Sequence, residues 1–179
     1  KETISGSYTI KDGTPFITDE AFWNCGGLTS VNIPNSATRI GIGTFRNCEK
    51  LASITIPDSI TNIDNGAFSG CINLTNINIP DNVADIGSSA FSGTGLTSIT
   101  IPNSATRIGI GTFSNCERLT SITIPDSVTS IDYEAFSGCT GLTIINYRGT
   151  EAEWTAVKKE INWNNETGEY TIIYNYKGE

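Results

Sequence analysis

A segment of about 23 residues recurs almost end to end along this chain. The copy at 51–71, LASITIPDSITNIDNGAFSGC, shows the pattern in full. One phenylalanine marks each copy, with successive spacings of 23, 23, 23, 22 and 23 residues: Phe22, Phe45, Phe68, Phe91, Phe113 and Phe136. Columns of leucine and of proline keep the same step. Since a single copy cannot bury its apolar side chains alone, this period predicts repeats that stack into a leucine-rich solenoid.

Each full copy begins with the pattern L-x-x-[I/V]-x-I-P. In LASITIP (51–57) apolar and polar residues alternate, which predicts a short strand with one buried face. The proline ends the strand because it has no N–H to donate, and the Asp or Asn that follows is typical of a turn. The outward positions hold small neutral residues, with no Trp, Tyr or Arg. We therefore expect this face to be solvated.

The second half of the copy, NGAFSGC, predicts a single helical turn. Two residues after each phenylalanine the chain has only Gly or Asn, the residues that tolerate a left-handed backbone: Asn24, Asn47, Gly70, Gly93, Asn115 and Gly138. One further column holds the five cysteines, with Thr94 in the remaining copy: Cys25, Cys48, Cys71, Cys116 and Cys139. One cysteine per copy at one site predicts a ladder of small buried thiols and not a disulfide framework.

We predict a right-handed solenoid over residues 1–149, with one parallel strand and a short helical or 3₁₀ turn in each repeat of 22–23 residues. The first repeat, 1–27, is atypical. After Leu142 the pattern fails, and Thr150-Glu151-Ala152-Glu153 has the form of a capping box. We expect a helix there with Trp154, Val157 and Ile161 on one face, then a turn at 162–168 and a strand within 169–176. Residues 150–179 are thus predicted to form a small α/β cap.

Composition argues against several classes of function. The net charge of −8 disfavours nucleic-acid binding, and no run of 18 apolar residues could form a transmembrane segment. The chain has no histidine, which removes Ser-His and Cys-His pairs, so we predict no catalytic residues, no cofactor and no enzyme. Asp58 and Asp81 could share a cation, but turn formation explains their column better, and no metal site is predicted.

Six residues are candidates for contact with a partner. Trp23, Ile42, Ile110 and Tyr133 are expected on exposed bends, where apolar side chains can mark a binding surface. Local packing of adjacent loops explains them equally well. Arg39 and Arg107 occupy equivalent positions in a duplicated block, since IPNSATRIGIGTF occurs at 33–45 and again at 101–113.

The repeat LTSITIPDSVTSIDYEAFSGC (119–139) resembles the BspA-like leucine-rich repeats, a class of bacterial surface-protein repeats. The ending YRGTEAEW (147–154), followed by INW (161–163), is similar to the terminal segment of such proteins in gut-dwelling bacteria. The resemblance covers about residues 8–163. It implies a secreted or cell-surface protein of a host-associated bacterium, with adhesion or protein binding as its function and no shared catalytic residues.

We therefore expect a monomeric extracellular adhesion module that binds a host protein or glycan without catalysis. The competing hypothesis is a structural spacer that projects another domain of a surface protein. A carbohydrate-active enzyme is a remote alternative, because it would need acidic residues gathered in a cleft.

Overall fold

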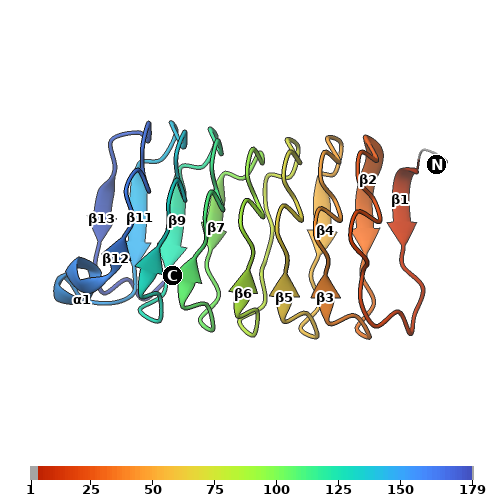
Figure 1. The fold of residues 1–179 in the computed structure, drawn as a ribbon, viewed down its shortest axis with the longest axis horizontal. Coiled ribbons are helices and arrows are strands. Elements are labelled where there is room, and N and C mark those ends of the chain that lie inside the picture. Colours follow the sequence, from red (N-terminus) through yellow and green to blue (C-terminus); the bar gives the residue numbers. More distant parts are fainter. Residues whose placement is uncertain (1–3, 179) are drawn as a thin grey trace.

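The computed structural model describes residues 4–178, which form a parallel β-solenoid of about seven turns (Figure 1). We call each turn a coil and number the coils from the N-terminus. Their boundaries follow the leucine column: coil 1 is 5–27, coil 2 is 28–50, coil 3 is 51–73, coil 4 is 74–95, coil 5 is 96–118, coil 6 is 119–141 and coil 7 is 142–168.

One wall of the solenoid consists of the strands that the L-x-x-I-x-I-P pattern predicts. These strands are β1 (Ser5–Thr9), β2 (Gly27–Asn32), β4 (Ser53–Thr55), β7 (Ser98–Thr100), β9 (Ser121–Ile124), β11 (Ile144–Tyr147) and β13 (Thr171–Ile173). They pair in parallel and in register, so that Ile99, Ile122 and Ile145 face one another in successive coils. These isoleucines are buried. The residues before and after each of them along the strand, such as Ser98 and Thr100, point outward, and we call the surface that they form the strand face.

The opposite wall is made of two-residue strands. They are β3 (Arg39–Ile40), β5 (Asn62–Ile63), β6 (Asp85–Ile86), β8 (Arg107–Ile108), β10 (Ser130–Ile131) and β12 (Lys158–Lys159). In the first five the second residue is a buried isoleucine, as in Ile40 and Ile63. The core therefore lies between two narrow walls of parallel strands. Each coil advances along the solenoid by about one strand spacing.

A stack of phenylalanine rings runs along the core. The six rings of the phenylalanine column lie with neighbouring centroids 5.2 to 5.7 Å apart and planes 5° to 15° apart. Tyr8 meets Phe22 edge-on at one end, at 5.2 Å, and Trp163 meets Phe136 edge-on at the other, at 6.0 Å. The stack links every coil to the next by aromatic contact.

The turn that carries each phenylalanine makes hydrogen bonds between residues three apart, as in a 3₁₀ turn, but forms no continuous helix, so of the two expected alternatives it is closer to the 3₁₀ turn. In coil 3 the amide of Ser69 donates to the carbonyl of Gly66 in its own turn (3.1 Å), whereas the amide of Gly70 donates to the carbonyl of Ser92 in the next coil (2.8 Å). A helix would keep both bonds within the segment. The predicted left-handed column is confirmed, since its six Asn and Gly residues have φ between 58° and 75°.

The predicted thiol ladder is confirmed for the four cysteines from coil 2 onward, which are buried and free. Each Sγ donates to the carbonyl of the phenylalanine in the preceding coil, as Cys48 does to Phe22 at 3.1 Å. Cys25, in coil 1, is only half-buried. In coil 4 the hydroxyl of Thr94 replaces the thiol and donates to the carbonyl of Phe91 at 2.8 Å.

Helix α1 (Glu151–Ala156) begins at the predicted capping box. Glu153 N donates to Thr150 Oγ1 (3.3 Å), and Thr150 N donates back to Glu153 Oε2 (2.7 Å). The Thr150 N–H and the Thr150 hydroxyl (2.9 Å) both donate to Glu153 Oε2, and these two bonds lower the pKa of the Glu153 carboxyl because they favour its charged form. The helix ends sooner than expected. Trp154 and Val157 are buried, but Ile161 lies beyond the helix and is 74% exposed, so its predicted place on the helical face is wrong.

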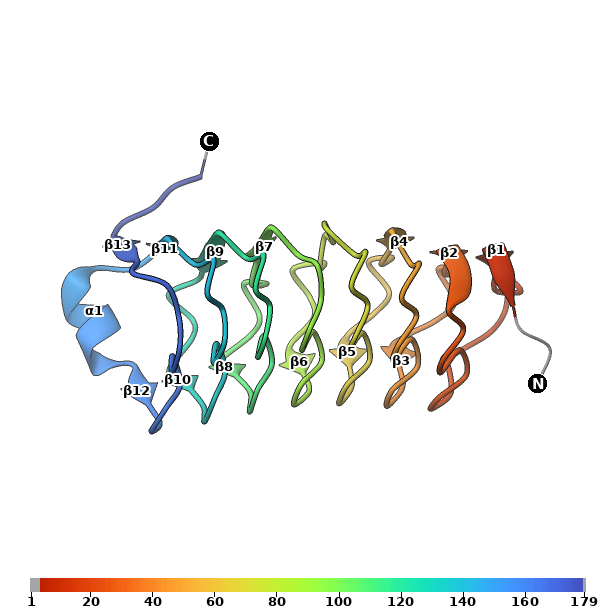
Figure 2. The same ribbon diagram turned by 90° about the horizontal axis from the view of Figure 1, so that it is seen from above.

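Both walls continue past α1. Strand β12 pairs with β10, and β13 pairs with β11, so the helix is inserted into coil 7 between two strands of the stack (Figures 1 and 2). Trp154 packs against Tyr147 at 5.1 Å and against Trp163 at 6.2 Å. Among residues 4–178 no helix has the length and apolar character needed to cross a membrane.

Both ladders are interrupted near coil 4. On the strand wall, β4 and β7 belong to separate sheets, and the segment 75–79 between them forms no strand within the described part of the chain. On the opposite wall the break falls between β6 and β8. Coil 4 is also the coil with 22 residues, because Leu96 comes five positions after Phe91, whereas in the other coils the next leucine comes six positions after the phenylalanine.

Candidate functional site

The predicted apolar candidates are exposed at the surface, with 43% of Trp23, 44% of Ile42, 47% of Ile110 and 40% of Tyr133 accessible. They do not gather at one place. Trp23 and Ile42 belong to coils 1 and 2, whereas Ile110 and Tyr133 belong to coils 5 and 6.

The two arginine candidates make equivalent ion pairs. Arg39 Nε donates to Asp64, and the guanidinium of Arg107 bonds to Asp132, in each case one coil further along. The bond from Asp132 raises the pKa of Arg107. Each arginine is therefore paired with a carboxylate across adjacent coils, which leaves its charge less available to a partner.

Three exposed apolar residues form a ridge on adjacent coils. Gly111 N donates to the carbonyl of Tyr133 (3.0 Å), which places Ile110 beside Tyr133. Strands β10 and β12 pair in register, and two residues beyond each strand this register sets Tyr133 beside Ile161. We call Ile110, Tyr133 and Ile161 the apolar ridge. Sequence reasoning missed Ile161 because it assigned this residue to the cap helix.

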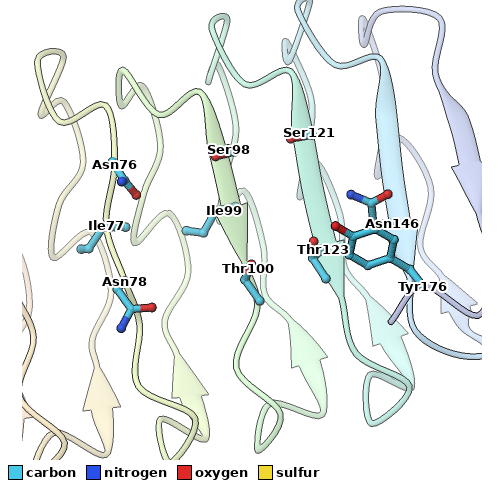
Figure 3. Close-up of a pocket in the computed structure, with 10 residues that line it drawn as sticks. All are labelled: Asn76, Ile77, Asn78, Ser98, Ile99, Thr100, Ser121, Thr123, Asn146 and Tyr176. Atoms are coloured by element: carbon cyan, nitrogen blue, oxygen red, sulfur yellow. The ribbon is translucent and has the colours of Figure 1, made fainter. Parts of the chain in front are cut away.

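The strand face carries a hollow of about 420 Å³ next to the interruption at coil 4 (Figure 3). Its polar lining comes from three neighbouring coils: Asn76, Asn78, Ser98, Thr100, Ser121 and Thr123. Asn146 of β11 and Tyr176 close the C-terminal side. Ile77 and Ile99, both at most 5% exposed, also line it where their segments of the strand wall pass behind the polar residues, while their side chains belong to the core.

Tyr176 reaches the strand face because the segment after β13 turns back across the sheet (Figure 2). Backbone bonds hold this segment there: Asn175 N donates to the carbonyl of Gly149 (2.8 Å), and Tyr176 N donates to the carbonyl of Tyr147 (3.1 Å). The expectation of a strand face without aromatic residues is therefore wrong at its C-terminal end. The composition of the strands held no sign of this, since Tyr176 lies outside them.

The polar groups of the hollow become more enclosed towards Tyr176. Thr100 is exposed, whereas Thr123, one coil further along, is only 8% exposed. Its hydroxyl makes no hydrogen bond among residues 4–178 and faces the hollow (Figure 3). Because this hydroxyl is open to the hollow, it can donate to or accept from a bound molecule.

The acidic residues of the turns do not assemble into a site with metal-binding geometry. Within the described residues no group of three His, Cys, Asp or Glu side chains is placed to hold an ion. Asp58 and Asp81 line a second, more open hollow together with Arg148, whose Nη1 donates to Asn103 Oδ1 at 2.6 Å. Asp81 Oδ1 accepts from the amide of Asn103 (3.1 Å), so this carboxylate links its turn to the equivalent turn of the next coil.

Comparison with known protein families identifies the family of these repeats. The BspA type leucine rich repeat region matches residues 10–149 in six copies. The chain therefore belongs to the BspA-type leucine-rich repeat family. No match was found among curated proteins.

Solved structures of similar proteins come from several bacteria. A leucine-rich repeat protein from Bacteroides ovatus is 34% identical with a TM-score of 0.74, over 79% of this chain and 42% of that one. The T. pallidum leucine-rich repeat protein is 34% identical with a TM-score of 0.75, over 78% of this chain and 68% of that one. A leucine-rich cell surface protein from Faecalibacterium prausnitzii is 36% identical with a TM-score of 0.58, over 85% of this chain and 34% of that one. The chain thus spans less than half of the B. ovatus protein.

Proposed function

We propose that this chain is a non-catalytic binding module, displayed at a bacterial cell surface, that contacts a host protein or glycan. The hollow on the strand face carries the proposal. It combines amide and hydroxyl groups from three coils with the ring of Tyr176, and small-molecule and peptide sites characteristically join a few convergent polar groups to apolar surface. Membership of a repeat family with a cell-surface relative supports display outside the cell.

A binding screen tests this function. The 179-residue chain is immobilised and exposed to host matrix proteins, mucins and an array of glycans, with Tyr176→Ala, Trp23→Ala and Tyr133→Ala alongside. We expect a saturable ligand whose binding Tyr176→Ala weakens. Light scattering on the same preparations tests whether the module is a monomer.

The competing function is a spacer that projects another domain. The ridge and the hollow would then have no ligand, and no class of molecule in the screen would bind. If a ligand binds and only Trp23→Ala or Tyr133→Ala weakens its binding, the chain is a binding module whose site lies on those exposed bends and not in the hollow.

A further inference from the structure

We infer that the hollow binds an uncharged carbohydrate, with the ring of Tyr176 as the wall against which a sugar packs. This inference rests on the proposed binding function and names the chemical class of its ligand. It depends on four properties of the hollow: its shape, its hydrogen-bonding groups, its charge and its aromatic wall.

The shape arises from the break at coil 4. The segment that carries Asn76 and Asn78 forms no strand within residues 4–178, so its side chains stand at the edge of the sheet that begins with β7. The ring of Tyr176 lies at the other side, between Thr123 of β9 and Asn146 of β11 in the view of Figure 3. The volume of about 420 Å³ falls within the range of about 300–1,000 Å³ that is usual for small-molecule sites.

The hydrogen-bonding groups repeat from coil to coil. The amides of Asn76, Asn78 and Asn146 each offer both donors and an acceptor, and the serine and threonine hydroxyls do the same. Parallel strands repeat every 4.7–4.9 Å or so, so similar groups recur at that step across the hollow. A sugar presents hydroxyls that donate and accept around its ring, and this lining can pair with them.

Thr123 is the residue that points most directly to a ligand. The residue is only 8% exposed, and its hydroxyl, which makes no hydrogen bond within the part of the chain that the structure describes, stays open to the hollow. Ser92, Thr97 and Thr120 on other columns do use their hydroxyls to bond backbone carbonyls of adjacent coils. The outward threonines of the described strands, such as Thr55, Thr100 and Thr123, make no such bond, and of these three only Thr123 is enclosed.

The charge excludes acidic ligands. Among the described residues, no Lys, Arg, Asp or Glu lines the hollow, and the nearby Arg148 is bonded to Asn103 in the second hollow. The chain as a whole carries a net charge of −8, which repels sulfated or sialylated sugars. An uncharged sugar needs no charged partner in the hollow and is not repelled by the net charge of the chain.

The aromatic wall favours a sugar over a flat protein surface. Protein partners are usually held by clusters of Trp, Tyr and Arg, whereas the hollow has one ring, that of Tyr176, surrounded by small polar groups. A single ring beside amides and hydroxyls suits the apolar C–H face and polar rim of one sugar unit.

Isothermal titration tests the inference with neutral trisaccharides of N-acetylglucosamine, galactose and mannose, and with the same sugars carrying sulfate or sialic acid. We expect at least one neutral trisaccharide to bind more tightly than its charged versions. Tyr176→Ala and Thr123→Val should each weaken that binding about tenfold or more. Thr55→Val, in the same column of coil 3 and outside the hollow, is the matched control and should leave binding unchanged.

Three results would overturn the inference: binding of the charged sugars only, neutral binding that neither Tyr176→Ala nor Thr123→Val weakens, or no sugar binding at all. The screen against host proteins distinguishes a failure of the carbohydrate inference from a failure of the proposed binding function. If a host protein binds and no sugar does, the carbohydrate inference is wrong and the proposed function stands. If neither binds, both are wrong.

Discussion

Thr123 and Tyr176 line the same hollow on the strand face, one from strand β9 and the other from the segment that follows β13. Thr123 is only 8% exposed and its hydroxyl is open to the hollow, whereas Tyr176 is half-buried and lies beside it in the lining. Their juxtaposition depends on coil 7, because the segment with Tyr176 is bonded to Tyr147 at the end of β11.

Tyr176→Ala should leave the fold intact. The residue is held by its backbone, through the bond from its N–H to the carbonyl of Tyr147, and the substitution keeps this bond. We expect the free energy of unfolding in urea to change by no more than about 0.5 kcal/mol, as is usual away from the core. A loss of several kcal/mol would mean that the ring has a structural role, and binding data for this variant would then need the Thr123→Val comparison.

Phe68→Ala should strongly destabilise the solenoid. The ring is fully buried between Phe45, at 5.3 Å, and Phe91, at 5.4 Å, so its removal leaves a cavity in the middle of the stack. We expect a loss of about 3–5 kcal/mol in the free energy of unfolding, measured by urea titration. Phe16→Ala is the control, since Phe16 is 52% exposed, and equal losses in the two variants would contradict the role of the stack.

Gly66→Ala and Gly70→Ala should differ although both residues have left-handed backbones, with φ of 62° and 75°. At Gly66 a Cβ would have its nearest neighbour 4.0 Å away, so only the backbone strain of about 1–2 kcal/mol applies. At Gly70 the Cβ would overlap Asn47 Oδ1, which accordingly makes the second substitution more costly.

A double-variant cycle in thermal unfolding isolates the overlap. Asn47→Gly removes the obstructing side chain and keeps a residue that accepts the left-handed backbone. We expect Gly70→Ala to cost less in this background than in the original chain. If Gly70→Ala lowers the stability equally in both backgrounds, the contact between residues 47 and 70 does not contribute to the effect of the substitution.

The buried thiols should make stability fall at high pH. Burial, with a smaller contribution from the neighbouring Cys25, raises the pKa of Cys48 to about 12 from an ordinary value of 9.0. Above about pH 9 the unfolded chain therefore loses a proton that the folded chain keeps, and the free energy of unfolding declines by up to about 1.4 kcal/mol per pH unit for this group. Below pH 8 the group has no effect.

Urea unfolding between pH 7 and pH 10 measures this decline. In Cys48→Ala the decline above pH 9 should be shallower, even though the variant is less stable at every pH. Identical slopes in the two proteins would contradict the account of Cys48 as a neutral buried thiol.

The repeat columns were predictable because each column obeys one local rule. The alternation of Leu51, Ile54 and Ile56 predicts the strand, and the restriction to Gly and Asn two residues after each phenylalanine predicts the left-handed backbone. A second left-handed column, four residues earlier in each turn, includes Glu20, Ser89 and Glu134 and was missed. Its other three members are Gly43, Gly66 and Gly111, but the two Glu residues and the Ser conceal the preference for Gly.

The candidate site was largely unpredictable from the sequence. The hollow needs the break in the ladder at coil 4, whose only trace is the single residue missing between Phe91 and Leu96. It also needs Tyr176, whose position depends on backbone bonds to Gly149 and Tyr147, far away in the sequence, and not on a local pattern. Ile161 joined the apolar ridge for a similar reason, because helix α1 ends at Ala156.

The location of the binding site can be measured most directly by NMR of the ¹⁵N-labelled chain during titration with the ligand that the screen identifies. We expect saturable amide shifts to concentrate at Asn78, Thr123 and Tyr176 and at their neighbours in the hollow. Shifts centred on the apolar ridge, or no shifts at a ligand concentration that saturates the immobilised chain, would contradict the assignment of binding to the strand face.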